Sequence, residues 1–153
     1  MSLTVNFDGA CWPNPGGRAT WGYVIRDDDG NLVSEDSGRV VHGNAFKEDT
    51  AVFTNNVAEW AALHAALAWL SENGYENREI AIKGDSQLVV KQLTGEWQCK
   101  KAYLRVYLAE CRKLLERFRW SIQWVSRDEN SEADRLSTEE WEEEEGKPFP
   151  IFK

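Results

Sequence analysis

The chain opens with strict alternation of apolar and polar residues. Apolar side chains fall on one side of this segment and polar ones on the other, namely Leu3, Val5 and Phe7 against Thr4, Asn6 and Asp8. This pattern predicts a strand with one face in the core. Glycine and proline are frequent from Gly9 to Gly17, so we expect the strand to end at Asp8 and a turn-rich loop to follow. A carboxylate would then stand at the exposed end of a strand.

Two more strands are predicted directly after this loop. Residues 19–26 and 31–41 are separated by Asp27-Asp28-Asp29-Gly30, which is typical of a hairpin turn. The three aspartates lack the later Glu and the flanking helices of a calcium loop, and a solvated turn explains them better. The segment therefore predicts three antiparallel strands, with a loop over residues 43–53.

The rest of the chain alternates between helical and strand patterns. Helices are predicted over 54–73, 86–93, 101–118 and 130–136, and strands over 79–83 and 120–125. Thr54 or Asn55 would cap the first helix, and Asn73-Gly74 would end it. This order predicts an α/β protein with a five-stranded mixed sheet, in which two parallel strands join the three antiparallel ones and helices flank the sheet.

Length and composition limit the class of protein. A chain of 153 residues with 42% hydrophobic content can bury one core and is too short for two ordinary domains. No apolar run is long enough to span a bilayer, and the N-terminus has no signal pattern. We expect a cytoplasmic monomer without a membrane partner. Three cysteines without metal-ligand spacing argue against a zinc site or a disulfide framework.

The net charge of −8 is unevenly distributed. Residues 139–153 contain six Glu and two Lys, so half of the excess negative charge lies there. Basic residues gather instead in the stretch that contains Lys83, Lys91, Lys100, Lys101, Arg105, Arg112, Lys113, Arg117 and Arg119. A local basic surface can bind a polyanion, so the overall charge does not exclude nucleic acid.

Four acidic residues fall at strand ends or near helix starts: Asp8, Glu59, Asp85 and Asp134. In an α/β sheet such positions can converge on one crevice. Taken singly, each is explained better by a helix cap or a surface charge. Together they would repel one another unless divalent cations neutralise them, and oxygen ligands favour Mg²⁺ or Mn²⁺ over zinc. Two such ions about 4 Å apart are suited to phosphodiester cleavage.

Four blocks resemble, in order and spacing, the signature of type 1 ribonuclease H: Phe7-Asp8-Gly9-Ala10 with Asn14-Pro15-Gly16, Thr54-Asn55-Asn56-Val57-Ala58-Glu59, Gly84-Asp85-Ser86-Gln87-Leu88-Val89, and Asn130-Ser131-Glu132-Ala133-Asp134-Arg135-Leu136. The resemblance covers residues 3–137 and implies a ribonuclease H-like fold in a domain of residues 1–138. It implies endonucleolytic hydrolysis of the RNA strand of RNA/DNA hybrids, which leaves a 5′-phosphate and a 3′-hydroxyl. Two Mg²⁺ ions, with Mn²⁺ as an alternative, would be held by Asp8, Glu59, Asp85 and Asp134.

The resemblance also implies a set of residues that read the substrate. Backbone and amide groups would approach the minor groove of the hybrid, where a 2′-hydroxyl distinguishes RNA from DNA. The matching positions are Gly9, Ala10, Cys11, Asn14, Asn55, Asn56 and Gln87. Helix capping is the alternative role for the two adjacent asparagines.

The sequence departs from the family pattern in two places. The loop before Asp134 has no histidine, so Arg127 or Glu129 is the candidate for helping the product leave. Residues 94–101 pass directly between two helices, which makes this a short form without the lysine-rich basic protrusion. Trp97 could pack on the DNA strand there, and a place in the core would explain it equally well.

Residues 139–153 differ in composition from the rest, and we expect an acidic, solvated C-terminal tail. Its apolar end, Pro148-Phe149-Pro150-Ile151-Phe152, could instead fold back on the domain or dock on another protein, and the tail could lie near the basic groove. Two alternatives to the nuclease remain open. One is a non-catalytic module of the same fold that binds hybrid or duplex. The other is a hydrolase that acts on sugars through a carboxylate pair.

Overall fold

The computed structural model describes residues 2–40 and 53–150. Within them a five-stranded sheet has the order β3-β2-β1-β4-β5. Its strands are β1 (Ser2–Trp12), β2 (Arg18–Asp27), β3 (Leu32–Arg39), β4 (Glu79–Gly84) and β5 (Arg119–Trp124). The first three strands pair antiparallel, and β4 and β5 join β1 in parallel. The predicted mixed sheet is confirmed.

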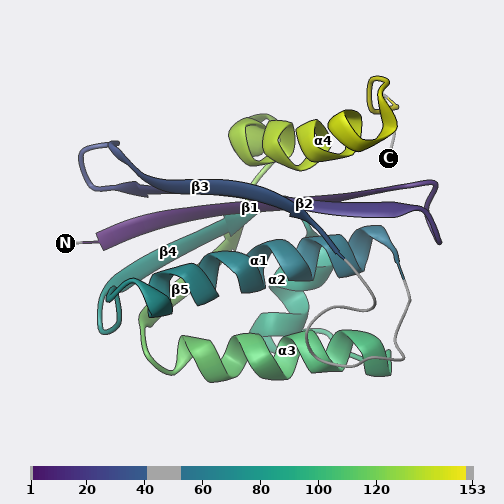
Figure 1. The fold of residues 1–153 in the computed structure, drawn as a ribbon. Helices are drawn as coiled ribbons and strands as arrows, with labels where there is room; N and C mark the ends of the chain where they lie inside the picture. The colour runs from purple at the N-terminus through teal and green to yellow at the C-terminus, as the bar shows by residue number, and fades with distance from the viewer. Residues whose placement is uncertain (1, 41–52, 151–153) are drawn as a thin grey trace.

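Helices cover both faces of this sheet (Figure 1). They are α1 (Asn55–Glu72), α2 (Gln87–Thr94), α3 (Ala102–Leu115) and α4 (Ser131–Glu145), with a short 3₁₀ turn, η1 (Asp128–Asn130), before α4. Helices α1, α2 and α3 lie on one side, with α1 between the sheet and α3, and α4 lies on the other side. The predicted elements are all present. Of the predicted loop over 43–53, residues 43–52 lie outside the described residues.

The turn between β2 and β3 is held by the Asp27 carboxylate. Its Oδ1 accepts the backbone N–H groups of Asp29 and Asn31, both at 2.9 Å. Gly30 has a φ of 82°, a conformation that glycine adopts without steric cost. The three aspartates thus form an exposed turn, as predicted.

Strand β1 is longer than its sequence pattern predicts. It pairs with β2 through Gly9 and Ala10 as far as Trp12, which lies opposite Arg18. Asp8 is therefore inside the strand and only 1% exposed. The expectation of an exposed strand end at Asp8 is wrong, because backbone pairing with β2 outweighs the local turn propensity of the glycine.

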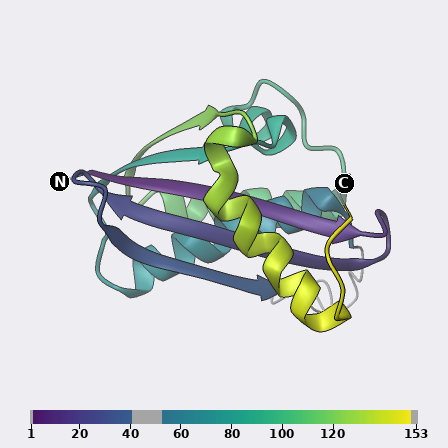
Figure 2. The ribbon, with the colours of Figure 1, turned by 90° about the horizontal axis from the view of Figure 1, so that it is seen from above.

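Helix α4 includes much of the segment that we expected to be a solvated tail. It continues to Glu145 and crosses the sheet obliquely (Figure 2), so the boundary predicted at 138/139 falls inside it. Ala133, Ser137 and Trp141 are buried at helical spacing, which fixes this helix on the sheet. Residues 139–145 therefore continue α4, with Trp141 buried and most of the glutamates exposed to solvent.

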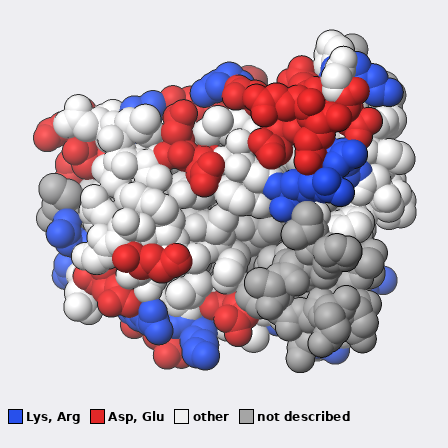
Figure 3. All heavy atoms as spheres, viewed as in Figure 1, with Lys and Arg blue, Asp and Glu red and all other residues white. Residues whose placement is uncertain are grey.

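The segment after α4 folds back on that helix. The rings of Phe149 and Trp141 meet edge to face, with centroids 5.1 Å apart. Phe149 thus packs against α4, and contact of the apolar end with residues 1–138 or with another protein stays a prediction; residues 151–153 lie outside the described part of the chain. Acidic side chains gather over the C-terminal half of α4 beside basic ones (Figure 3). Arg18 pairs there with Glu144 and Glu145 at 3.1 and 2.7 Å.

Among the described residues, no helix combines the length and the apolar character that crossing a bilayer requires.

Candidate active site

Two neighbouring strands bring Asp8 and Asp85 together. Phe7 of β1 lies opposite Gly84, the last residue of β4, so the aspartates that follow these two residues are adjacent. A Cβ on Gly84 would come within 2.4 Å of the Phe7 ring. Glycine at this position therefore lets the ring pack across the end of β4 and keeps the two strands in register.

Helix α1 delivers the third carboxylate through a close approach to β1. A Cβ on Gly9 would lie 2.2 Å from the carbonyl carbon of Ala58 and 2.4 Å from the nitrogen of Glu59. Only glycine allows the first turns of α1 to come this near. The Gly9 N–H donates to Asp8 Oδ1 at 2.9 Å and also to Glu59 Oε1. One backbone group thus holds two carboxylates side by side.

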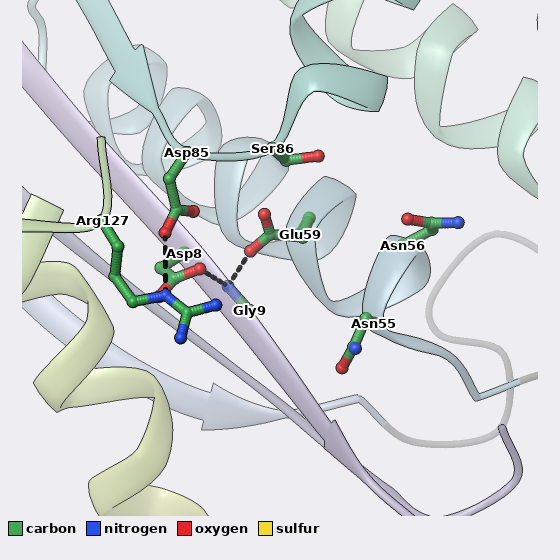
Figure 4. A pocket seen from close by; sticks show the side chains of 8 residues that line it. All are labelled: Asp8, Gly9, Asn55, Asn56, Glu59, Asp85, Ser86 and Arg127. Atoms are coloured by element: carbon green, nitrogen blue, oxygen red, sulfur yellow. Dashed lines mark hydrogen bonds and ion pairs between the residues drawn. The ribbon is translucent and has the colours of Figure 1, made fainter. Parts of the chain in front are cut away.

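These residues form a carboxylate cluster, which we define as Asp8, Glu59 and Asp85. One carboxylate oxygen from each lies within 4.8 Å of the others. Asp8 and Glu59 are 1% and 7% exposed, and Asp85 is partly exposed. The cluster lines a pocket that is open to solvent and faces Asn55, Asn56, Ser86 and Arg127 (Figure 4).

The donor set of the carboxylate cluster fits a hard divalent cation. Three carboxylates this close repel one another, and burial weakens the screening by water. A Mg²⁺ or Mn²⁺ ion bound by their oxygens removes that repulsion. The residues present therefore suit such an ion better than zinc, which favours nitrogen and sulfur ligands.

Asp134, the fourth predicted carboxylate, lies in the first turn of α4. It is partly buried, and its backbone carbonyl accepts the hydroxyl groups of Ser137 and Thr138. The structure does not bring its carboxylate into the group of three whose oxygens lie within 4.8 Å. Its role as a metal ligand stays a prediction.

The two product-release candidates differ in position. Arg127 lines the pocket, with its Nε 3.9 Å from Asp85 Oδ2 (Figure 4). Glu129 is exposed, and its Oε1 accepts the Ser126 hydroxyl at 3.3 Å. The geometry thus favours Arg127 as the group that meets an anion beside the cluster. Ser86, which the sequence pattern did not single out, also lines the pocket and caps α2 by accepting the Val89 N–H.

Asparagine side chains fix the loop beside the pocket. Asn55 Oδ1 accepts the Cys11 N–H at 2.8 Å, and Asn14 Oδ1 accepts the Asn55 N–H at 3.1 Å. Thr54 is the helix cap, because its hydroxyl accepts the Val57 N–H at 3.1 Å. The capping alternative for the asparagines is therefore wrong, and Asn55 presents its amide NH₂ as a donor.

The remaining predicted readers are not equally accessible. Ala10 and Cys11 are fully buried, so their side chains cannot reach a substrate, and burial raises the pKa of the Cys11 thiol. Asn56 lines the same pocket as the carboxylate cluster (Figure 4). Gln87 is exposed at the start of α2, and Trp97 is 44% exposed. A core role for Trp97 is thereby excluded.

Several cations of the predicted basic region stabilise the fold itself. Arg105 donates to the backbone carbonyl of Lys100, in the short connection between α2 and α3, and Arg112 donates to the carbonyl of Gln92 near the end of α2. Arg117 pairs with Glu76, and Lys91 pairs with Glu96. Lys91 also lies 5.7 Å from the centroid of the Trp97 ring. Basic residues here hold the direct connection in place, and fewer of them face solvent unpaired than the sequence suggests.

Asn130 supports the site from within the fold, a role that the sequence analysis did not assign to it. Its side chain is 1% exposed, donates to the Phe7 carbonyl at 2.8 Å, and accepts from Asn6 Nδ2 at 3.0 Å. These bonds join the start of α4 to β1 one residue before Asp8. A helix-start pattern gives no signal for such contacts, because the partners are more than 100 residues away.

Comparison with known proteins identifies relatives of this chain. Residues 6–140 match the family described as reverse transcriptase-like. The chain is 42% identical to ribonuclease HI of Halobacterium salinarum over 134 residues, which are 87% of this chain and 61% of that protein. This chain therefore spans less than two thirds of that relative's length. It is also 34% identical to a bifunctional protein of Mycobacterium tuberculosis, in a match that covers 91% of this chain and 35% of that protein.

Solved structures agree in fold over nearly the whole chain. The crystal structure of RNase H1 from Halobacterium salinarum matches with a TM-score of 0.80 and 38% identity, and the match covers 94% of this chain and 99% of that one. LC11-RNase H1 in complex with an RNA/DNA hybrid matches with a TM-score of 0.75 and 29% identity over 88% and 92% of the two chains. The chain therefore belongs to the reverse transcriptase-like family and, within it, to the type 1 ribonucleases H.

Proposed function

We propose that this protein is a metal-dependent endoribonuclease that hydrolyses the RNA strand of RNA/DNA hybrids. The observation that carries the proposal is the carboxylate cluster, in which three carboxylates from β1, α1 and the end of β4 converge on one pocket. Similarity to proteins named ribonuclease HI and RNase H1, one of them in complex with an RNA/DNA hybrid, supports the reaction and the substrate.

Asp8, Glu59 and Asp85 would hold the metal, and Asp134 would join them as the fourth ligand. We expect two Mg²⁺ ions, with Mn²⁺ as a substitute, because the ligands are carboxylate oxygens. When bound, such ions activate the attacking water and stabilise the oxygen that leaves. The protein prepares for them by holding Asp8 and Glu59 on the Gly9 N–H before any ion arrives.

Other residues of the pocket would position the hybrid. Asn55 is held by the Cys11 N–H and by Asn14, so its NH₂ group can donate to a 2′-hydroxyl or a base edge in the minor groove. Arg127 would meet the phosphate near Asp85 and stabilise the 5′-phosphate product as it leaves. The exposed Trp97 would provide a surface for stacking on the DNA strand.

The test is cleavage of end-labelled substrates by the purified chain with Mg²⁺. We expect cuts in the RNA strand of a hybrid, products with 5′-phosphates, and no cleavage of single-stranded RNA, double-stranded RNA or the DNA strand. EDTA should abolish the reaction. Hybrid binding without cleavage, with either Mg²⁺ or Mn²⁺, would instead show a non-catalytic binding module.

A further inference from the structure

The end of β5 contacts Asp85 at its backbone as well as at its side chain. The indole Nε1 of Trp124 donates to the Asp85 carbonyl at 3.1 Å. The next residue, Val125, donates its N–H to the Gly84 carbonyl at 2.9 Å. Three residues later in the chain than Trp124, Arg127 reaches the Asp85 carboxylate. The segment from Trp124 to Arg127 therefore contacts the backbone of Gly84 and both the backbone and the carboxylate of Asp85.

Asp85 needs such support because it lies where regular structure changes. Strand β4 ends at Gly84 and α2 begins at Gln87, with Ser86 as its cap. The Asp85 peptide group therefore belongs neither to the β ladder nor to the helix. The indole of Trp124 satisfies its carbonyl from outside both elements. A carboxylate can bind a metal in fixed geometry only if the backbone that carries it is fixed as well.

Packing alone does not explain the orientation of the Trp124 side chain. It is 46% exposed, so much of the apolar area of the ring is not buried, and its hydrogen bond accounts for its orientation. Trp120 provides a comparison on the same strand. Trp120 lies on the same face of β5 and is 38% exposed. Its partner on β4 is Ile80, whereas the partner of Trp124 is Gly84.

We propose that Trp124 is a positioning residue for Asp85, whose indole N–H sets the backbone of that metal ligand and thereby raises the affinity of the carboxylate cluster for divalent cations. The inference rests on the proposed function, since it assigns metal binding to Asp85. It concerns the hydrogen bond, which phenylalanine removes together with one of the two fused rings and which benzothiophene removes while both rings stay.

The experiment measures Mg²⁺ and Mn²⁺ binding to the full chain by isothermal titration, without nucleic acid, for wild type, W124F and W120F. We expect W124F to weaken metal binding by about 3- to 10-fold, as loss of one hydrogen bond predicts, and W120F to match wild type. In hybrid cleavage, W124F should need correspondingly more Mg²⁺ for half-maximal kcat while the KM for the hybrid stays unchanged. Replacing the indole by benzothiophene, which keeps the two fused rings and removes the N–H, should reproduce W124F.

Equal metal affinities for W124F and W120F would overturn the proposal. So would a raised KM for the hybrid at unchanged metal affinity, because that result would make Trp124 a substrate contact. The titrations contain no substrate, so they separate this inference from the proposed function. A wild-type protein that binds metal but cleaves no hybrid would refute the function and leave the role of Trp124 to be decided by the titration.

Discussion

The close packing of α1 on Gly9 predicts a large effect from a single methyl group. In Gly9→Ala, the new Cβ would lie 2.2 Å from Ala58 C and 2.4 Å from Glu59 N, where ordinary contact begins at 3.4 Å. Both neighbours are backbone atoms, so the start of α1 must move away from β1 by about 1 Å. Glu59 would then leave the Gly9 N–H, and the carboxylate cluster would open.

A shift of this size should reduce both catalysis and stability. Misplacement of a reacting group by about 1 Å can cost about 10²-fold in rate, and we expect kcat for hybrid cleavage to fall at least that far. Overpacking should lower the free energy of unfolding by about 1–3 kcal/mol. Single-turnover cleavage at saturating Mg²⁺ and urea denaturation in EDTA measure the two effects separately.

Gly30→Ala is the matched control for this change. Gly30 has a φ of 82°, and no atom of the described residues lies within 4 Å of the position that its new methyl group would take. Alanine there costs about 1 kcal/mol of stability through backbone strain. The hairpin is remote from the carboxylate cluster, and cleavage should be unchanged. If Gly9→Ala cleaved hybrid as fast as Gly30→Ala, the close approach of α1 could not be what assembles the site.

Three further results are expected. Trp141→Ala should lower the free energy of unfolding by about 3–5 kcal/mol in urea denaturation, because Trp141 is only 1% exposed on the side of α4 that faces the sheet. A loss below about 1 kcal/mol would contradict the packing of this helix. Burial lowers the pKa of His64 despite Glu110, so the unfolded chain takes up the proton first and stability falls as the pH drops through about 6.5. His64→Leu should flatten the thermal-unfolding profile between about pH 7.5 and 5.5, and an unchanged slope would refute this. Arg127→Ala removes a cation that lies 3.9 Å from Asp85 and would repel Mg²⁺. The Mg²⁺ concentration for half-maximal cleavage should therefore fall by about 2- to 5-fold, whereas in W124F it should rise. An increase in Arg127→Ala would contradict the proposed electrostatics.

The order and type of the elements could be read from sequence because each has a clear period. Alternation in β1 and the apolar spacing in α1 both hold in the structure. The length of β1 could not be read, since Gly9 favours a turn locally and only its pairing with β2 keeps it extended. Pairing partners distant in sequence leave no trace in the local pattern.

The acidic residues 139–145 form part of a helix that their charge did not predict. Six glutamates suggested a solvated tail, yet glutamate is a good helix former and Trp141 gives the helix an apolar side. The spacing of Ala133, Ser137 and Trp141 was present in the sequence, but Ser137 is buried there by contact with β2 rather than by its own hydrophobicity. Gly146, with a φ of 72°, ends the helix.

The candidate site was predictable as a set of carboxylates but not as an arrangement. Oxygens of Asp8, Glu59 and Asp85 lie within 4.8 Å of one another in the structure, and Asp134 is not a member of that group of three. Their spacing depends on what surrounds them: the missing side chain of Gly9, the Asn130 amide on the Phe7 carbonyl, and the Trp124 indole on Asp85. Such contacts join residues far apart in the chain, so no single stretch of sequence indicates them.

The most direct measurement compares wild type and Asp85→Asn in Mg²⁺-dependent cleavage of an RNA/DNA hybrid, with thermal unfolding in EDTA on the same samples. The substitution keeps the shape of the side chain and removes one charge from the carboxylate cluster. We predict that kcat falls by roughly 10³-fold or more, while the unfolding temperature without metal stays the same or rises because repulsion is relieved. Cleavage at the wild-type rate by a folded Asp85→Asn protein would contradict the assignment of this cluster as the catalytic metal site.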